Sequence, residues 1–430
     1  MTATSFPVSG RSYYEATQGP RPDTSPLQGE THADVCVVGG GYTGLSTALH
    51  LARQGVRVAV LEQDTLGAGA SGRNGGQVHV GMRRGQGWLE RKLGRDDAMH
   101  LWTCALEARE HLDWLLSHYA IQCDMRPGYL HADHKRRHLA HSRANVSLLN
   151  ERYDFPHIRY VEEEEMRARV ATTDYYGGTL DTRGGHLHAL NFALGIAAAA
   201  AAEGAMLHDH SRVTAISRCS GGWRVQSEQG AVIADRVVVA CNGYLRGLLP
   251  EAEARVMPIN NFVATTVPLG RERAEALIRD RVAVSDSRFV IYYFRITADD
   301  RLLFGGGESY TYRFPDRIDQ TVRRHMLHVF PQLEEVPLEH AWGGRLAVTP
   351  NRLPYLRQVK PGLFAVAGYS GLGVVLAPYF GKLLAEALVG GSATFDRLTS
   401  LPVPRFPGGR LLRWPTLVAA MSFFALRDVL

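Results

Sequence analysis

The fold is decided by residues 34–62, DVCVVGGGYTGLSTALHLARQGVRVAVLE. Residues 35–38 form an apolar run typical of a buried parallel strand, residues 45–54 have the pattern of a helix, and residues 56–61 resemble a second strand. Residues 39–44, GGGYTG, stand between the first strand and the helix with the spacing G-x-G-x-x-G. Strand, glycines, helix, second strand and a terminal acid in this order predict a βαβ unit that binds the pyrophosphate of a dinucleotide.

Each glycine of this motif has its own role. Gly39 permits the tight turn, Gly41 lets a phosphate approach the backbone, and Gly44 lets the helix pack close to the strand. The first helical turn, which contains Tyr42 and Thr43, offers N–H groups and the positive end of the helix dipole to the phosphates.

Glu62 ends the second strand and completes the motif. Its carboxylate can accept hydrogen bonds from ribose hydroxyls, and its negative charge disfavours a 2′-phosphate. These features do not distinguish NAD from FAD.

A second glycine cluster, GAGASGRNGGQVH at residues 67–79, follows the acidic strand end. Its small side chains suit a backbone that passes close to a large flat ligand, and Ser71, Arg73 and Asn74 can contact phosphate or ring. The alternative is a flexible loop. An NAD enzyme has no evident need for this segment, whereas FAD would extend along it from the first turn towards its ring system.

Composition limits the class of protein. The 430 residues are 45% hydrophobic and 21% charged, which is ordinary for a globular chain of two domains. The net charge is +5 with both signs interspersed, so we expect no nucleic-acid partner. Five scattered cysteines without a C-x-x-C motif favour reduced thiols and no zinc site.

Two further observations concern metal binding and location. His134, His138 and His141 are spaced for one helix face, but residues 135–137 are Lys, Arg and Arg, so we expect a solvated basic face and no metal. No basic and apolar leader opens the chain, and no apolar run is long enough to span a bilayer, so a cytoplasmic location is expected.

Later segments are expected to return to the first sheet. Residues 237–240 form a buried strand that ends near Asn242 and Gly243, and residues 251–343 form a β-rich antiparallel unit. Residues 363–367 are predicted as a strand, followed by a tight loop, GYSGLG, and a helix at residues 374–389.

The glycine-rich helix start at Gly371, Leu372 and Gly373 suits a flavin ring. Its N–H groups can point at the N1–C2=O edge, which gains negative charge when the ring is reduced. A purely structural turn is the alternative.

Taken together, these segments resemble the D-amino-acid-oxidase-like superfamily of FAD-dependent oxidoreductases, and within it the bacterial γ-glutamylputrescine oxidase branch. The resemblance covers nearly the whole chain. It rests on residues 34–62, 69–79 (GASGRNGGQVH), 184–195 (GGHLHALNFALG), 293–308 (YFRITADDRLLFGGGE), 342–354 (WGGRLAVTPNRLP) and 368–388 (GYSGLGVVLAPYFGKLLAEAL).

The resemblance implies an α/β fold, α+β overall, with a Rossmann-like FAD-binding domain and an inserted antiparallel-sheet substrate domain. The discontinuous FAD domain is expected at residues 1–90, 181–245 and 342–400, the substrate domain at 91–180 and 246–341, and a C-terminal extension with an apolar helix at 401–430.

By matching position, the resemblance also implies the residues that contact non-covalent FAD, with Val213 meeting the adenine through its backbone. They are Gly39, Gly41, Tyr42, Thr43, Gly44, Glu62, Gln63, Ala70, Ser71, Arg73, Asn74, Gly75, Gly76, Gln77, Val213, Asn242, Gly243, Gly371, Leu372, Gly373 and Val374.

Three departures from the relatives concern the flavin. Leu372 stands where relatives usually carry a His, so an imidazole near the ring is lost. Sarcosine-oxidase-like members carry a Lys over the flavin, and the matching positions here are Leu303 and Phe304. No Cys stands where those members tether flavin covalently.

The implied reaction is oxidation of an amine C–N bond. A hydride passes from the α carbon to flavin N5, and the iminium product hydrolyses to an aldehyde or keto compound. Such a transfer needs positioning and a neutral amine more than a strong base. Candidate substrate contacts are His79, Tyr293, Arg295, Arg345 and Tyr369; of these, Arg295 or Arg345 can clamp a carboxylate.

Three alternatives remain at this stage. A flavin dehydrogenase would pass its electrons to a carrier or quinone instead of O2, an NAD-dependent enzyme needs only the first motif, and a non-catalytic FAD-binding subunit needs no substrate. The apolar segment at residues 417–426 is expected to dock on this protein, with a partner subunit or a membrane surface as the other candidates.

Overall fold

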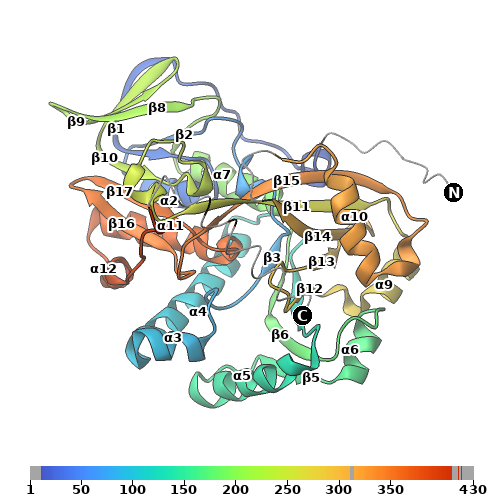
Figure 1. The fold of residues 1–430 in the computed structure, drawn as a ribbon. Helices are drawn as coiled ribbons and strands as arrows, with labels where there is room; N and C mark the ends of the chain where they lie inside the picture. Colours follow the sequence, from blue (N-terminus) through green and yellow to red (C-terminus); the bar gives the residue numbers. More distant parts are fainter. Residues whose placement is uncertain (1–10, 310–313, 409–414, 416–417, 419–430) are drawn as a thin grey trace.

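The computed structural model describes residues 11–309, 314–408, 415 and 418, which form two β-sheets with helices packed around them (Figure 1). The eight-stranded sheet contains β1 (Gly29–Val38), β2 (Val58–Leu61), β7 (Met206–His208), β8 (Val213–Cys219), β9 (Gly222–Ser227), β10 (Gly230–Val239), β16 (Tyr355–Lys360) and β17 (Leu363–Ala367). The nine-stranded sheet contains β3 (Gln77–Val78), β4 (Arg126–Ala132), β5 (Ile158–Val161), β6 (Gly178–His186), β11 (Met257–Thr266), β12 (Ala283–Asp286), β13 (Tyr293–Ile296), β14 (Leu302–Ser309) and β15 (Leu338–Val348).

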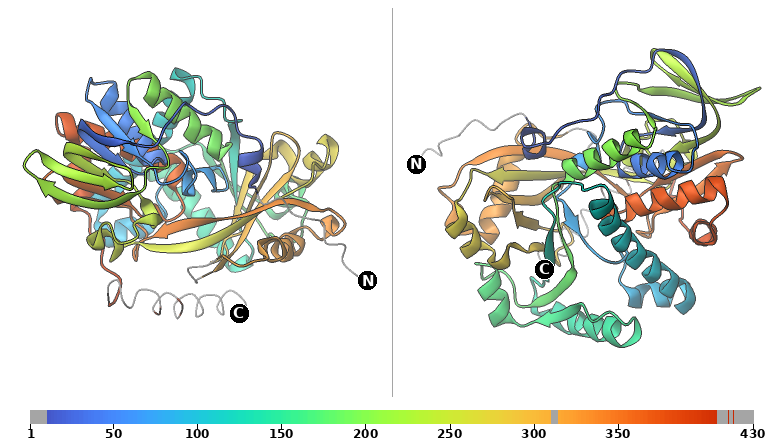
Figure 2. Two further views of the ribbon diagram at one scale, coloured as in Figure 1. Left: turned by 90° about the horizontal axis from the view of Figure 1, so that it is seen from above. Right: turned by 180° about the vertical axis from the view of Figure 1, so that it is seen from behind.

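The helices connect and cover these sheets, as three views show (Figures 1 and 2). They are α1 (Tyr13–Ala16), α2 (Tyr42–Ala52), α3 (Gln86–Leu93), α4 (Arg95–His118), α5 (Leu139–Arg152), α6 (Glu163–Arg169), α7 (Ala189–Ala202), α8 (Pro250–Glu253), α9 (Arg271–Leu277), α10 (Ile318–Val329), α11 (Gly373–Val389) and α12 (Ala393–Ser400).

The first sheet has the order β16-β17-β10-β1-β2-β7, and β17, β10, β1, β2 and β7 run parallel. Parallel strands are covered on both faces, which explains why residues 35–38 and 58–61 are apolar and fully buried. The predicted βαβ unit is confirmed. Strand β1 begins at Gly29, earlier than the apolar run, because Gly29 already pairs with Gly230 of β10.

Helices α2 and α11 pack directly against each other. A Cβ on Gly381 would lie 2.6 Å from the Thr43 carbonyl oxygen, so only glycine permits this approach. The Ser46 hydroxyl donates to the Pro378 carbonyl at 2.6 Å. The contact therefore fixes the start of α2 relative to α11.

The second sheet has one apolar face. Phe294, Phe304 and Leu130 belong to a buried cluster that includes Val322 and Met326 of α10. Residues that alternate with them along the strands point to the opposite face, which carries polar side chains together with buried apolar ones such as Val263 and Leu303. The sheet thus separates one large apolar core from a mixed face that packs against other parts of the molecule.

Several sequence expectations are corrected. The second sheet is not wholly antiparallel, because β4 and β12 pair in parallel. The helix expected at residues 86–118 is broken at Gly94, whose φ of +89° ends α3 and begins α4. Of the three histidines expected on one helix face, only His141 lies in an α-helix, because α5 begins at Leu139; His138 ends a short 3₁₀ turn.

The N-terminal arm is less superficial than expected. Tyr13 and Tyr14 are 3% and 0% exposed, and they pack in a cluster with Leu303 of β14 and Trp342 of β15. The short helical start is confirmed as α1, closed by a capping box between Ser12 and Glu15.

The proposed domain boundaries stay a prediction. The cuts between residues 180 and 181 and between 341 and 342 fall inside β6 and β15, both of the second sheet. The expected apolar C-terminal helix lies outside the described residues, apart from positions 415 and 418. Within the described chain no single helix is long and apolar enough to cross a membrane; α11 and α12 together pass by length and composition alone, bent by 111°.

Candidate active site

Segments far apart in the chain meet where the parallel strands end. The carboxyl ends of β1, β2, β10 and β17 share one edge of the sheet, the usual place for a bound nucleotide. The Gly40 N–H donates to Glu62 Oε2 at 2.7 Å, and the Gly368 N–H donates to Asn242 Oδ1 at 2.9 Å. The structure therefore brings the predicted cofactor residues of four strand ends together.

The turn into α2 requires its glycines. Gly39 has a φ of +113°, and a Cβ there would lie 2.8 Å from the Ala240 carbonyl oxygen. A Cβ on Gly44 would lie 1.9 Å from the Gly39 carbonyl oxygen. Gly41, the N-cap of α2, has no side chain to cap the helix, and the Tyr42 N–H in the first turn donates to the Ser71 hydroxyl. The first turn of α2 is thus held against the strand end, where the positive end of its dipole favours an anion.

Glu62 lies beside this turn in a largely enclosed position. Burial raises the pKa of its carboxyl group, while backbone N–H groups of Asp64 and Gly40 favour the charged form. The Ser211 N–H donates to the Glu62 carbonyl at 2.7 Å, which places Val213, the start of β8, close to Glu62. Gln63 follows directly and is half-buried.

The second glycine cluster is attached to the start of α2. The Ser71 hydroxyl accepts from the Tyr42 N–H at 2.9 Å, and Ala70 to Gly72 form a single 3₁₀ turn. The Asn74 amide donates to the Ser71 carbonyl at 2.9 Å, and its oxygen accepts from the Gly76 N–H at 2.7 Å. The Asn74 side chain therefore holds the loop in shape through hydrogen bonds to the loop's backbone.

The same loop also touches the second sheet. A Cβ on Gly75 would lie 2.5 Å from the Tyr293 ring, and the Gln77 amide donates to the Val284 carbonyl at 2.7 Å. The Arg73 guanidinium forms an ion pair with Glu15 of α1 at 2.9 Å. Residues 73–77 thus lie between the edge of the first sheet and a face of the second.

The late loop is fixed on the first one. The Tyr369 hydroxyl lies 2.5 Å from Thr43 Oγ1, and Tyr369 is 5% exposed. Ser370 and Gly371 have positive φ values of +54° and +106°. Leu372 is the N-cap of α11, again with no cap from a described side chain. The starts of α2 and α11 are therefore held together at one edge of the first sheet, with Gly373 and Val374 in the first turn of α11.

The polar face of the second sheet carries several side chains that the sequence did not single out. Ser285 pairs with both Tyr293 and His131, so all three point to the same side, and Tyr129 is two residues before His131. The Tyr129 hydroxyl contacts the Ser285 hydroxyl.

A β-bulge adds Glu308 to this face. Val263 pairs with Gly305 and Asn261 pairs with Glu308, so two steps on β11 oppose three on β14. The bulged segment of β14 contains Gly307, whose φ is +84°. Because paired side chains share a side, the bulge turns Glu308 from the apolar face to the face of Tyr293.

A hydrogen bond joins two loops that carry basic residues. The Arg84 guanidinium donates to the Asn351 carbonyl at 3.5 Å, which connects the segments that carry Arg83 and Arg352. Burial lowers the pKa of Arg83, and the charge of Glu308 opposes that shift, while part of the Arg83 side chain is exposed to water.

His79 is the predicted contact at the end of the glycine cluster that packs beside the second sheet. Burial, followed by the charges of His131 and Arg83, lowers the pKa of His79 to about 4. Its ring centre lies 5.0 Å from that of Tyr129. Its Nδ1 is buried and has no hydrogen-bond partner among the described residues.

The other predicted contacts have different surroundings. Arg295 is 3% exposed and donates to the carbonyls of Gly75 and Leu187 and to the Tyr14 hydroxyl, at 2.9 to 3.1 Å, so its guanidinium is committed to protein groups. Arg345 is half-buried, with its guanidinium carbon 5.5 Å from the Tyr244 ring centre.

Arg83, Arg352, Glu308, Tyr129 and His131 were missed from the sequence. Arg352 lies in the segment WGGRLAVTPNRLP at residues 342–354, in which only Arg345 was predicted to contact substrate. Glu308 ends the segment YFRITADDRLLFGGGE at residues 293–308. The bulge beside Glu308 and the φ of +67° at Arg352 are backbone features that residue spacing does not reveal.

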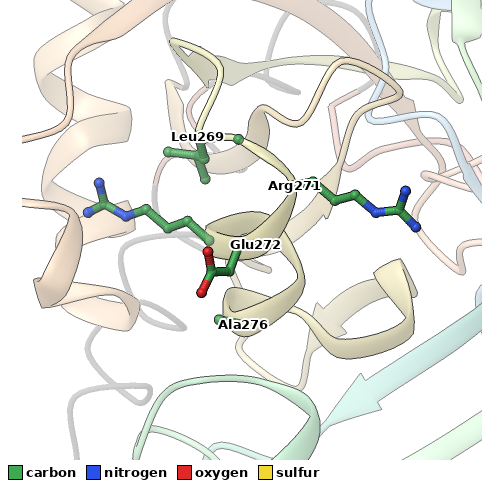
Figure 3. Close-up of a pocket in the computed structure, with 6 residues that line it drawn as sticks. Leu269, Arg271, Glu272 and Ala276 are labelled. Carbon is green, nitrogen blue, oxygen red and sulfur yellow. The ribbon is translucent and has the colours of Figure 1, made fainter.

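Two surface cavities lie elsewhere. One of about 420 Å³ is lined by residues 269–273 and Ala276 at α9 (Figure 3). The other, of about 590 Å³, lies among α2, α4 and α11 beside His50 and His111. None of the predicted site residues lines either cavity.

The residues present at the sheet edge fit a long dinucleotide with a flat ring system. Side chains at Gly39 and Gly44 would collide with the backbone, the starts of α2 and α11 lie at this edge, and the loop from Ser71 to Gln77 extends towards the second sheet. These features define a dinucleotide-binding flavoprotein.

Comparison with known proteins supports this class. The family model described as "FAD dependent oxidoreductase" (DAO) matches residues 34–387. The chain belongs to this family, and its cofactor is FAD.

Named relatives are similar over their full lengths. The chain is 40% identical over 424 residues to "Probable oxidoreductase OrdL" of Rhizobium meliloti (strain 1021), covering 98% of each chain. It is 38% identical over 418 residues to "Gamma-glutamylputrescine oxidoreductase" of Escherichia coli (strain K12), covering 97% of this chain and 98% of that one. The crystal structure of glycine oxidase from Geobacillus kaustophilus has the same fold, with a TM-score of 0.71 and 22% identity over 85% of this chain and 96% of that one.

Proposed function

We propose that this enzyme oxidises the C–N bond of an amine resembling γ-glutamylputrescine. The observation that carries the proposal is the placement of Tyr293, Tyr129 and His79 beside one face of the second sheet, next to the loop and helix start assigned to the flavin end of the cofactor. The similarity to a γ-glutamylputrescine oxidoreductase supports the choice of an amine. Secondary amines and amino acids are the other members of the proposed substrate class.

The protein groups beside this face favour a neutral amine. His79, with its pKa lowered to about 4, is uncharged near neutral pH, and its buried Nδ1 is available for a hydrogen bond. The Arg83 guanidinium disfavours a second cation nearby, which lowers the pKa of a bound amine. Only the neutral amine has the lone pair that assists departure of hydride from the α carbon.

FAD, when bound, supplies the hydride acceptor. In the proposal, the start of α2 and Glu62 hold its ADP half, Val213 borders the adenine, and the ring end lies between residues 73–77 and the start of α11. We propose non-covalent binding, because no cysteine occurs in residues 42–103 or 242–430. Tyr369 and Arg295 are assigned as positioning residues on the basis of their buried contacts.

The electron acceptor is O2 or a separate carrier. Leu303 and Phe304 are both fully buried apolar residues at the positions matched to the flavin-side Lys of sarcosine-oxidase-like members, which favours a dehydrogenase as the second candidate. A partner subunit or membrane contact through the C-terminal segment belongs to that second candidate.

Turnover of γ-glutamylputrescine with and without an artificial electron acceptor tests the proposal. An oxidase consumes about one O2 per aldehyde formed, whereas a dehydrogenase forms aldehyde only when the acceptor is added. Absence of product under both conditions, from protein that retains its flavin, contradicts the proposed substrate.

A further inference from the structure

The short helix α1 lies against the flavin loop, which we define as residues 68–77. Although α1 has only four residues, Tyr13 and Tyr14 are almost fully buried and pack in one cluster with Trp342 of β15. The Trp342 indole N–H in turn donates to the Arg73 carbonyl at 3.0 Å. Apolar packing therefore seats the N-terminal arm beside the loop from which the flavin end of FAD is expected to be held.

The Arg73 guanidinium is committed to protein oxygens. Its Nε donates to the Ala68 carbonyl at 3.0 Å, and its Nη1 donates to the Gly343 carbonyl of β15 at 3.5 Å. Its Nη2 donates to the Glu15 carboxylate of α1 at 2.9 Å. Each nitrogen of this side chain thus has a protein partner, and together the contacts close the loop on itself and attach it to β15 and α1.

The Glu15 carboxylate uses its two oxygens for two different elements. Oε2 accepts from the Ser12 N–H at 2.8 Å and from the Ser12 hydroxyl at 2.9 Å, which closes the capping box of α1. Oε1 accepts from Arg73. Burial raises the pKa of Glu15, but the Ser12 N–H and the Arg73 charge outweigh burial and lower it, so the group is charged near neutral pH. One carboxylate therefore couples the fold of α1 to the loop.

Tyr14 attaches α1 to the loop at a second point. Its hydroxyl accepts from Arg295 at 3.1 Å, and the same guanidinium donates to the Gly75 carbonyl at 2.9 Å. Farther along the arm, Arg21 donates to the Leu66 carbonyl at 3.1 Å, just before the loop begins. The arm is thus connected to the chain in front of the loop and to residues 73 and 75 within it.

We propose that residues 12–21 form a strap that holds the flavin loop in the conformation that binds FAD. Glu15 and Tyr14 are the positioning residues of this strap, and they act through Arg73 and Arg295. Because the strap and the cofactor act on the same loop, docking of the strap and binding of FAD strengthen each other by the same factor. The inference rests on the proposed placement of the flavin ring beside residues 73–77.

Glu15→Gln tests the strap because it keeps the size of the side chain and removes its charge. The Glu15 and Arg73 side chains are 33% and 30% exposed, so water screens their attraction only in part. We expect the Kd of FAD, measured by titration of the apoprotein, to rise about 10-fold.

Glu90→Gln is the matched control. Glu90 also pairs with an arginine, Arg152, at 2.7 Å, but this pair joins α3 to α5. Its removal is expected to change the Kd of FAD by less than about 2-fold. The visible circular dichroism of FAD at saturation, which reports the surroundings of the ring, should change in Glu15→Gln and not in Glu90→Gln.

A second variant tests the route through Arg73. In an Arg73→Met background the ion pair no longer exists, so Glu15→Gln should alter the Kd of FAD by less than about 2-fold. An undiminished 10-fold effect (about the size expected in the wild-type background) would show that Glu15 does not act through Arg73 and would overturn the inference.

Hydrogen exchange tests the reciprocal effect in the wild-type protein. The Ala16 and Thr17 N–H groups donate to the carbonyls of Ser12 and Tyr13 at 3.1 and 3.0 Å, so their exchange reports opening of α1. Addition of FAD to the apoprotein should slow this exchange about 10-fold. The Ala274 N–H, which donates to the Gly270 carbonyl at the start of α9, should show no such change and serves as the control.

These measurements use no amine, so they separate the strap from the proposed function. A weaker FAD complex in Glu15→Gln and in Tyr14→Phe, with slower α1 exchange on FAD binding, supports the strap even if no amine reduces the flavin. Two variants that bind FAD as tightly as the wild type, or α1 exchange that FAD does not slow, overturn the strap while leaving amine oxidation intact.

Discussion

Replacing Gly44 by Ala tests the assignment of the α2 start to FAD. The added Cβ would lie 1.9 Å from the Gly39 carbonyl oxygen, and real Cβ atoms essentially never approach closer than 3.0 Å. Helix α2 and the end of β1 must therefore separate by about 1 Å. Helix α2 is also held by Gly381 of α11, which leaves it little freedom to move away. Overpacking of this kind costs about 1–3 kcal/mol.

The expected result is loss of bound FAD with the rest of the fold retained. A displacement of about 1 Å also misplaces the N–H groups that receive the pyrophosphate, which we expect to weaken FAD binding by about 100-fold. The assay is the flavin absorbance per protein after gel filtration, followed by titration of the apoprotein with FAD and by circular dichroism. Gly390→Ala is the matched control, because no atom lies within 4 Å of its Cβ position and its φ is not positive. A Gly44→Ala protein that binds FAD as tightly as the wild type would refute this assignment.

Three other predictions concern the late loop, the N-terminal helix and buried histidines. Leu372→His should retain FAD, because the backbone of the α11 start is kept, but should add pH dependence near or below about pH 6.5 to flavin reduction; an unchanged stopped-flow pH profile contradicts this. Tyr14→Phe removes a hydroxyl that accepts from buried Arg295 at 3.1 Å, so the free energy of unfolding should fall by about 1–3 kcal/mol; an unchanged urea midpoint argues against it. Burial lowers the pKa values of His50 and His111, so the unfolded chain binds protons first as the pH falls below about 6.5, and the free energy of unfolding decreases. Between pH 6.5 and 5 the free energy of unfolding of His111→Gln should decrease by about 1.6 kcal/mol less than that of the wild type. An equal decrease in both proteins refutes the linkage.

The nucleotide half of the site could be predicted from the sequence because local rules determine it. A parallel strand must be apolar, the turn after it must be glycine, and the helix start must be uncapped to receive phosphate. The roles of Gly39, Gly44 and Glu62 can therefore be predicted from one short segment, residues 34–62. The structure places Asn242 and Gly368 at the same edge because parallel strands end together.

The substrate half could not be predicted to the same extent. Its face is assembled from β4, β12, β13 and β14, and a parallel pairing between β4 and β12 brings the first two together. The side to which Glu308 points depends on a single extra residue in β14, so an alternation rule applied to the sequence gives the wrong face. Arg295 was a reasonable carboxylate ligand by residue type, but only its buried contacts show that its donors are already used.

The N-terminal segment illustrates the same limit. Its capping box is a local pattern and was readable, whereas the burial of Tyr13 and Tyr14 depends on Trp342 and Leu303, more than 280 residues away. Long-range contacts of this kind leave no periodic trace in the sequence. They nevertheless connect α1 to Arg73 and Arg295 beside the flavin loop.

The central claim is that FAD in this protein is reduced by an amine. Purified, FAD-loaded enzyme should be mixed anaerobically with γ-glutamylputrescine, sarcosine, D- and L-amino acids and simple polyamines while the visible spectrum is recorded. Bleaching of the flavin band near about 450 nm by γ-glutamylputrescine, ahead of the other amines, is the result that the proposed function predicts. A flavin spectrum that no amine in the panel changes would contradict amine oxidation as the function of this enzyme.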